Sequence, residues 1–355
     1  MSVRSGTLAG MRPALRPGLL PLWRDSDTIQ IGVDPRRAVA ISGVRAAADV
    51  IRMLDGSRDR DQLVAEASRR GVPPGVTERI LGLLAAAGAV VDFPADMLRT
   101  VPPELRSQLM PVLTAASVAA QDSDGGASLL ARRSSCTVQV CGGGPVAPLI
   151  ADLLTRSGLA AASPDDSVLD HSPLGGPVRG GTALGGPVLG GSVLGGSALG
   201  SRGSAGGVPR ASQADLLVLV GRQLPAQSAQ LLRLRQPYLA VYADEAIGVV
   251  GPLVRPGRTA CLRCIDLTKA EGDTAWPLIL AQLSDRGAAV PSCDAVLASS
   301  VAAQAAAQAV AFADRSQLAE ATVNATLELV LPSWQWRRRS WQPHPACACG
   351  GHGAS

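Results

Sequence analysis

The chain has 355 residues and a hydrophobic fraction of 46%, which is enough to bury the cores of two domains. Its net charge is only +4, and Lys269 is its single lysine. A charge this balanced argues against a nucleic-acid partner, which needs a basic field on one face of the protein. We recognise no apolar run that approaches the roughly 18–20 residues of a membrane span, and no secretory signal peptide. We therefore expect a cytoplasmic protein without a membrane partner.

Residues 1–95 are expected to form a small winged-helix-like domain. Hydrophobic and polar residues alternate over residues 28–33 and 38–42, which predicts a β-hairpin. Helices are predicted at residues 45–54, 60–69 and 74–87, and a short strand at 89–92. A generic α/β cap domain has the same pattern. DNA binding is disfavoured, because residues 12–92 contain twelve arginines against ten acidic residues, too small an excess to follow phosphates.

A helical linker is predicted at residues 96–135, with a helix over 102–121, and an α/β domain at 136–355. A predicted strand at 136–141 is followed at once by Gly142, Gly143 and Gly144, and then by a predicted helix at 146–157. In this setting the backbone N–H groups and the helix N-terminus can hold a phosphate. The turn is a weakened form of the dinucleotide-binding motif, so it predicts a Rossmann-like unit more strongly than a bound nucleotide.

Residues 172–210 are a low-complexity insertion in which glycine-rich units repeat every ten residues. Glycine makes ordering costly and supplies little area to bury, so we expect a flexible loop rather than a solenoid. Beyond it, strands are predicted at 214–220, 238–242 and 247–254, and helices at 226–235 and 294–313. A terminal hairpin is predicted from residues 322–331 and 334–341, with the second strand an amphipathic edge strand.

Two close-set pairs of cysteines are the strongest chemical signal. Cys261 and Cys264 form the first pair, and Cys347 and Cys349 the second. Each pair can occupy one edge of a tetrahedron, so together they predict a closed, structural Zn²⁺ site. The second pair has C-x-C rather than C-x-x-C spacing, which leaves His344 or His352 open as a substitute ligand. Free or unrelated thiols are the alternative to a metal.

Cys293 is a weak catalytic candidate. It lies just before a long predicted helix, and a helix N-terminus can lower the pKa of a thiol and make it nucleophilic. No histidine is near it in sequence. A small apolar packing residue is therefore the simpler interpretation.

Residues 138–349 resemble the ThiF/MoeB/HesA superfamily of ubiquitin-activating-like adenylyltransferases. The resemblance rests on the glycine turn, on the Gly-Pro-Leu-Val sequence that precedes Cys261, and on the late cysteine pair. Within the superfamily the chain looks most like an actinobacterial branch related to the partner proteins of YcaO cyclodehydratases, which make azoline-containing peptides. This resemblance implies that the N-terminal element binds a leader peptide as an added β-strand.

The resemblance also implies a site for ATP and Mg²⁺, which this sequence supplies only in part. Asp165 or Asp166 would contact the ribose beside the glycine turn. The family's arginine and lysine would fall in the glycine-rich insertion, which has no lysine, and Arg222 stands where the family has a metal-binding aspartate. Adenylyl transfer depends on positioned positive charge, so we expect the adenylation site to be degenerate.

We therefore interpret the chain as a scaffold that binds a peptide or small-protein substrate for a separate modifying enzyme, such as a YcaO-like cyclodehydratase. The alternative is an ATP-dependent adenylyltransferase that activates the C-terminus of a small protein or peptide. A DNA-binding regulator is a third, less favoured class. The sequence does not determine the oligomeric state, and a homodimer is one of the alternatives.

Overall fold

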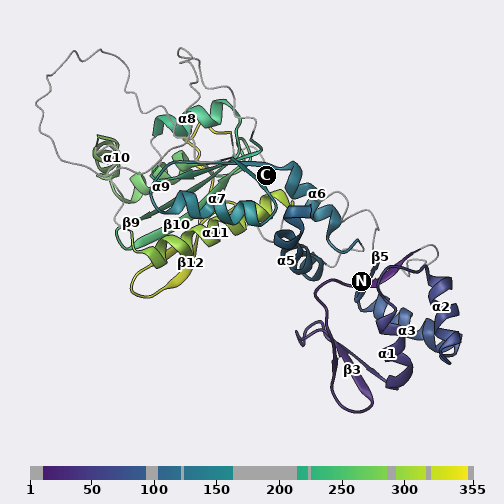
Figure 1. The fold of residues 1–355 in the computed structure, drawn as a ribbon. Helices are drawn as coiled ribbons and strands as arrows, with labels where there is room; N and C mark the ends of the chain where they lie inside the picture. Colours follow the sequence, from purple (N-terminus) through teal and green to yellow (C-terminus); the bar gives the residue numbers. More distant parts are fainter. Residues whose placement is uncertain are drawn as a thin grey trace, which may run out of the picture.

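The computed structural model describes residues 11–92, 103–120, 124–162, 214–222, 225–285, 293–316 and 321–350. Asp165, Asp166, His352 and the insertion at 172–210 lie outside the described residues. Within the described part, helices accompany one two-stranded, one three-stranded and one seven-stranded sheet (Figure 1). The mixed α/β class is confirmed. The winged-helix-like and Rossmann-like descriptions remain predictions.

The N-terminal unit contains a three-stranded antiparallel sheet in the order β2-β3-β4. Its elements, in chain order, are β1 (Pro13–Leu15), β2 (Pro21–Trp23), β3 (Thr28–Ile31), β4 (Val39–Ser42), α1 (Val44–Arg52), α2 (Arg60–Arg69), α3 (Pro74–Ala86) and β5 (Val90–Asp92). The hairpin and the three helices therefore form within a few residues of their predicted positions. The pairing of β1 with β5 and the pairing of β2 with β3 were not predicted.

The hydrophobic core of this unit lies between the β3–β4 hairpin and the helices. The fully buried side chains include Ile31, Leu63 and Leu84. On α3, Ile80 also lies in this core, whereas Leu83 is 51% exposed. Helix α1 packs against β3 and β4, while α3 packs mainly on α1, α2 and β5. The apolar positions of α3 are thus divided between the core and the surface.

Two helices, α5 (Pro103–Ala120) and α6 (Ala127–Ser135), lie between the N-terminal unit and the large sheet (Figure 1). The buried guanidinium of Arg16 donates a hydrogen bond to the carbonyl of Ser117, 2.6 Å away. At the other end, Arg133 on α6 makes two hydrogen bonds of 2.7 Å to Asp314. Helix α6 falls within the predicted helical linker, although it was not predicted as a separate helix. The two arginines connect α5 and α6 to their neighbours on both sides.

The seven-stranded sheet has the order β12-β11-β10-β9-β8-β6-β7. Its strands are β6 (Thr137–Cys141), β7 (Ala160–Ala162), β8 (Leu216–Val220), β9 (Tyr238–Asp244), β10 (Ile247–Val254), β11 (Ala325–Val330) and β12 (Gln335–Ser340). The four strands from β7 to β9 are parallel, and β10, β11 and β12 continue the sheet in antiparallel fashion. The carboxyl ends of the parallel strands therefore meet at one edge.

One face of this sheet is covered by α7 (Val146–Arg156) and α11 (Ala295–Ala313), which pack on each other and on the strands (Figure 1). In the described part of the chain, α11 is one helix whose length and hydropathy would suit a membrane span. The expectation that no apolar segment approaches that length was therefore wrong for α11. Its alanines, such as Ala302, Ala305 and Ala309, are buried against the sheet, which accounts for its apolar sequence.

The opposite face of the sheet carries α8 (Pro225–Arg233), α9 (Leu262–Gly272) and α10 (Trp276–Asp285). Side chains alternate between the two faces along each strand: on β9, Leu239 and Val241 face α11, whereas Tyr238 belongs to the core beneath α9. Strand β12 is an edge strand, as predicted, but all six of its residues are exposed. The amphipathic character expected for it is not found, because no element of the described chain covers either of its faces.

Candidate functional site

The two cysteine pairs lie together next to the large sheet. Cys261 is the N-cap of α9, and Cys264 lies in the first turn of that helix. Cys347 and Cys349 come from the segment that follows β12. All four residues are buried, and their sulfur atoms lie within 4.8 Å of one another. The cluster thus brings together cysteines that are separated by 85 and 86 positions in the sequence.

The sulfur geometry fits a metal ion. Neighbouring Sγ atoms are separated by 3.7 Å for Cys261 and Cys264, 3.7 Å for Cys261 and Cys347, and 3.5 Å for Cys264 and Cys349. A tetrahedral zinc with bonds of about 2.3 Å places its sulfur ligands about 3.8 Å apart. A disulfide requires about 2.05 Å, so these contacts are not disulfides. Four clustered cysteines of this kind could hold a metal ion such as zinc.

His344 lies beside the cluster but is engaged elsewhere. Its Nε2 atom is 2.9 Å from a carboxylate oxygen of Glu271, and its Nδ1 atom accepts a hydrogen bond from the N–H of Ala346. Both ring nitrogens therefore have partners, so in this arrangement His344 serves as a positioning group rather than as a ligand. The four cysteines form the ligand set that the described residues supply.

The thiols do not ionise alike without a metal. Burial raises the pKa of Cys347 to about 11, whereas hydrogen bonds, above all from Cys261, lower the pKa of Cys264 to about 4. A hydrogen bond to the Cys264 sulfur and burial raise the pKa of Cys261. Several thiolates cannot be buried side by side without a compensating cation. A divalent metal supplies that charge, which makes the donor set consistent with Zn²⁺.

The glycine turn lies between β6 and α7, at the carboxyl edge of the parallel strands. Gly142 has φ +106°, and a Cβ atom built on it would lie 2.0 Å from the carbonyl oxygen of Val220. Gly144 also has a positive φ, of +77°. A Cβ on Gly143, in contrast, meets no atom within 4 Å. Gly142 is therefore required for the close approach of β6 to β8, while Gly143 is free of packing constraints.

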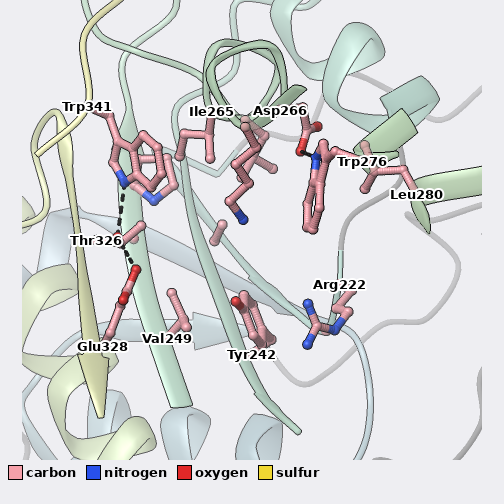
Figure 2. Close-up of a pocket in the computed structure, with 16 residues that line it drawn as sticks. Arg222, Tyr242, Val249, Ile265, Asp266, Trp276, Leu280, Thr326, Glu328 and Trp341 are labelled. Carbon is pink, nitrogen blue, oxygen red and sulfur yellow. Dashed lines mark hydrogen bonds between the residues drawn. The ribbon is translucent and has the colours of Figure 1, made fainter. Parts of the chain in front are cut away.

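A pocket lies between the sheet and helices α9 and α10 (Figure 2). Its space, including the open mouth, is about 840 Å³. The floor comes from Tyr242 on β9, Val249 on β10 and Glu328 on β11, and one wall from Trp276 and Leu280 on α10. Apolar and aromatic side chains with a few polar groups are the usual lining of a small-molecule site.

Hydrogen bonds hold most polar groups of the pocket (Figure 2). The indole N–H of Trp276 donates to Asp266 at 3.2 Å, and that of Trp341 donates to Thr326 at 3.0 Å. The Thr326 hydroxyl donates in turn to Glu328 at 3.1 Å. Burial raises the pKa of Asp266, and the hydrogen bond from Trp276 opposes that rise. The Trp276 ring is thus fixed by a carboxylate, and the Trp341 ring by a hydroxyl that is itself bonded to a carboxylate.

Two cations stack on aromatic rings that line the same pocket. The Lys269 ammonium lies 4.3 Å from the centre of the Trp276 ring, and the Arg222 guanidinium lies 4.4 Å from that of Tyr242. Arg222 is also 3.6 Å from a carboxylate oxygen of Asp244. Burial lowers the pKa of Lys269. Lys269 is the single lysine of the sequence, and no sequence pattern predicted the pocket that it lines.

Cys293 is half-buried, immediately before the N-cap residue of α11, Asp294. Burial raises the pKa of its thiol, and the charges of Asp294 and Asp244 raise it further. The lowering expected from the helix N-terminus is therefore overcome by burial and by two nearby carboxylates. The structure favours the interpretation of Cys293 as a packing residue.

Solved structures share this fold over nearly the whole chain. The heterocyclase TruD matches with a TM-score of 0.59 at 16% identity, covering 96% of this chain and 43% of TruD. A heterocyclase in complex with substrate and cofactor matches with a TM-score of 0.59 at 13% identity, covering 96% and 39% of the two chains. E. coli MccB with MccA-N7isoASN matches with a TM-score of 0.55 at 12% identity, covering 96% and 99%.

These matches show that the chain shares its fold with the heterocyclases and with MccB, whereas the ThiF-like family and its actinobacterial branch remain expectations from the sequence. The chain spans less than half the length of the two heterocyclases and nearly all of MccB. No protein-family model matches the sequence, and no curated protein does. At these identities the likeness establishes the fold alone.

Proposed function

We propose that this protein is a ThiF-like scaffold that binds a peptide for a separate modifying enzyme, such as a YcaO-like cyclodehydratase. The observation that carries the proposal is the likeness in fold, across 96% of the chain, to both a heterocyclase and MccB, whose structures include bound substrate or MccA. A structural zinc at the four cysteines completes the scaffold. A cytoplasmic location is consistent with reduced cysteines.

The free edge of the N-terminal sheet supports peptide binding by strand addition. Strand β3 is flanked by β2 and β4, so the hairpin has one open edge among the described residues, on β4. The N–H of Gly43 donates a hydrogen bond to the carbonyl of Asp27. In an antiparallel pair, hydrogen-bonded residue pairs alternate with non-bonded ones, so the next pair, Thr28 and Ser42, is not hydrogen-bonded. The N–H groups of Ala40 and Ser42 consequently point outward. A peptide added there would lie nearer to α1 than to α3, because α1 packs against β4.

Replacing Ala40 by Pro is expected to weaken binding of a precursor peptide encoded beside this gene by about tenfold. Proline removes an outward N–H that the sheet itself does not use, so the protein should remain folded. Fluorescence anisotropy with the full-length protein measures the effect. Ala40→Val keeps the N–H and is the matched control. Equal affinities for both variants, with a folded A40P protein, would refute strand addition at β4.

The pocket end of β8 argues against nucleotide chemistry. Arg222 follows this strand directly, and its guanidinium is held by Tyr242 and Asp244. A fixed positive charge repels Mg²⁺, which prefers carboxylate and phosphate oxygens. The main support for the adenylyltransferase alternative is the glycine turn. The close approach of Gly142 to Val220 explains a glycine there without any nucleotide.

We expect no ATP–pyrophosphate exchange above background, with or without the precursor peptide. The physical reason is that Arg222, a cation, follows β8 where the family resemblance places a metal-binding aspartate, and that the glycine-rich insertion, where the resemblance places a lysine, contains none. Radiolabelled exchange measures this directly, with an active adenylyltransferase as the positive control. Robust exchange that disappears on Gly143→Val, a position where an added Cβ meets no atom within 4 Å, would instead establish the adenylyltransferase.

A further inference from the structure

Lys269 is a charged group of the pocket without a hydrogen-bond partner among the described residues. Its ammonium carries three donors, yet within the described chain it stacks on the ring of Trp276 and has no hydrogen bond or ion pair. The side chain is half-buried, and burial lowers its pKa. A partly desolvated ammonium without an acceptor is costly, so the pocket is better suited to a ligand that supplies one.

The other charges around Lys269 have partners of their own. Asp266, on the same helix, accepts a hydrogen bond from Trp276, and Glu328 on β11 accepts one from Thr326. Arg222 stacks on Tyr242, and Arg339 on β12 stacks on Trp341. These two carboxylates and two guanidiniums act on Lys269 with opposite signs. The charges around Lys269 therefore offset one another, and what its ammonium lacks among the described residues is a hydrogen-bond acceptor.

Apolar side chains also line the pocket that holds this ammonium. Leu280 and Ile265 lie on the helix side of the pocket, and Val249 and Pro252 on the sheet side. In Figure 2, Trp276 lies on the helix side of the pocket and Tyr242 on its sheet side. Such a site accepts a ligand with one anionic end and an apolar or aromatic body.

We propose that this pocket binds a carboxylate attached to an apolar or aromatic body. The carboxylate accepts a charge-assisted hydrogen bond from Lys269, and the body packs between the rings of Trp276 and Tyr242. The carboxylate belongs either to a free organic acid or to the end of a peptide. Only the second source rests on the proposed scaffold function; the pocket chemistry itself does not.

The single lysine allows a direct test on the full-length protein. An amine-directed acetylating reagent has Lys269 and the N-terminal amine as its targets, and peptide mass spectrometry reads the two rates separately. Saturating 3-phenylpropionate is expected to slow acetylation of Lys269 about fivefold or more and to leave the N-terminal amine unchanged, because a hydrogen-bonded ammonium is withdrawn from reagent. The matched amide and 3-phenylpropylamine should not protect.

Binding of the same acid, measured by calorimetry, should weaken about tenfold in Lys269→Met, the scale of one charge-assisted hydrogen bond. Arg263→Met, which removes an exposed cation from the same helix, is the control and should bind normally. N-acetyl-phenylalanine and a longer peptide with a free or amidated C-terminus distinguish the two sources of the carboxylate.

Equal protection by acid and amide, protection by the amine, or no protection at millimolar acid would each overturn the inference. Failure here is separable from failure of the scaffold function. In that case a precursor peptide would still bind the protein and respond to Ala40→Pro, with Lys269→Met having no effect on it.

Discussion

Changing Cys349 to Ala is expected to release the bound metal and to lower the free energy of unfolding by about 3 kcal/mol or more. A structural zinc contributes roughly 10–16 kcal/mol of binding free energy, and because its site forms only on folding, that energy stabilises the fold. Cys349 is buried with its sulfur 3.5 Å from that of Cys264. Metal analysis of the purified protein should give one zinc per wild-type chain, and urea unfolding measures the loss of stability.

Cys293→Ala is the matched control, because this cysteine lies outside the cluster. It should keep one zinc per chain and unfold near the wild-type urea concentration. Wild-type protein purified without chelators and under reducing conditions, yet free of zinc, would contradict the metal site. The same conclusion would follow if C349A and the wild type had equal stability.

The cysteine cluster also determines where the pocket lies. Helix α9 begins at Cys261, and the same helix carries Asp266 and Lys269 into the pocket. Trp341, buried just beyond β12, precedes the second cysteine pair and lines the pocket as well. A metal that fixes both segments would therefore hold two walls of the pocket in place. Loss of the metal should disturb ligand binding together with stability.

Local signals in the sequence predicted the parts of the fold that depend on neighbouring residues. Helix α2 was placed correctly at both ends, since Asp59 and Gln62 form a capping box at its start. The alternation in the β3–β4 hairpin and the spacing of the cysteine pairs are signals of the same kind. They specify a conformation or a coordination geometry within a few residues.

Contacts between distant residues could not be predicted in this way. Strand β1 pairs with β5 across more than seventy residues, and three residues of ordinary sequence carry no signal of that partner. Arg222 and Lys269 line one pocket only because β8 and α9 are brought together by the sheet. The single lysine was visible in the sequence, but its ring partner Trp276 was not identifiable without α10.

Replacing Gly142 by Ala is expected to destabilise the protein by about 3 kcal/mol or more, or to abolish soluble expression. The backbone at Gly142 has φ +106°, which a side chain rarely tolerates, and the added Cβ would overlap the Val220 carbonyl oxygen. Neither β6 nor β8 can shift without disturbing the ladder they share. The cost therefore arises without any nucleotide, and urea unfolding of the purified variant measures it.

Gly143→Ala is the matched control one residue away. Its added Cβ meets no atom within 4 Å, so its stability should change by less than about 1 kcal/mol. If the turn held a phosphate, both glycines would be needed for ATP binding; if it serves the fold alone, only Gly142 is constrained. Equal stability of the two variants would show that β6 and β8 approach less closely than the structure indicates. A large difference would mean that packing alone accounts for Gly142, so the glycine turn is not by itself evidence for the adenylation chemistry that we expect this chain to lack.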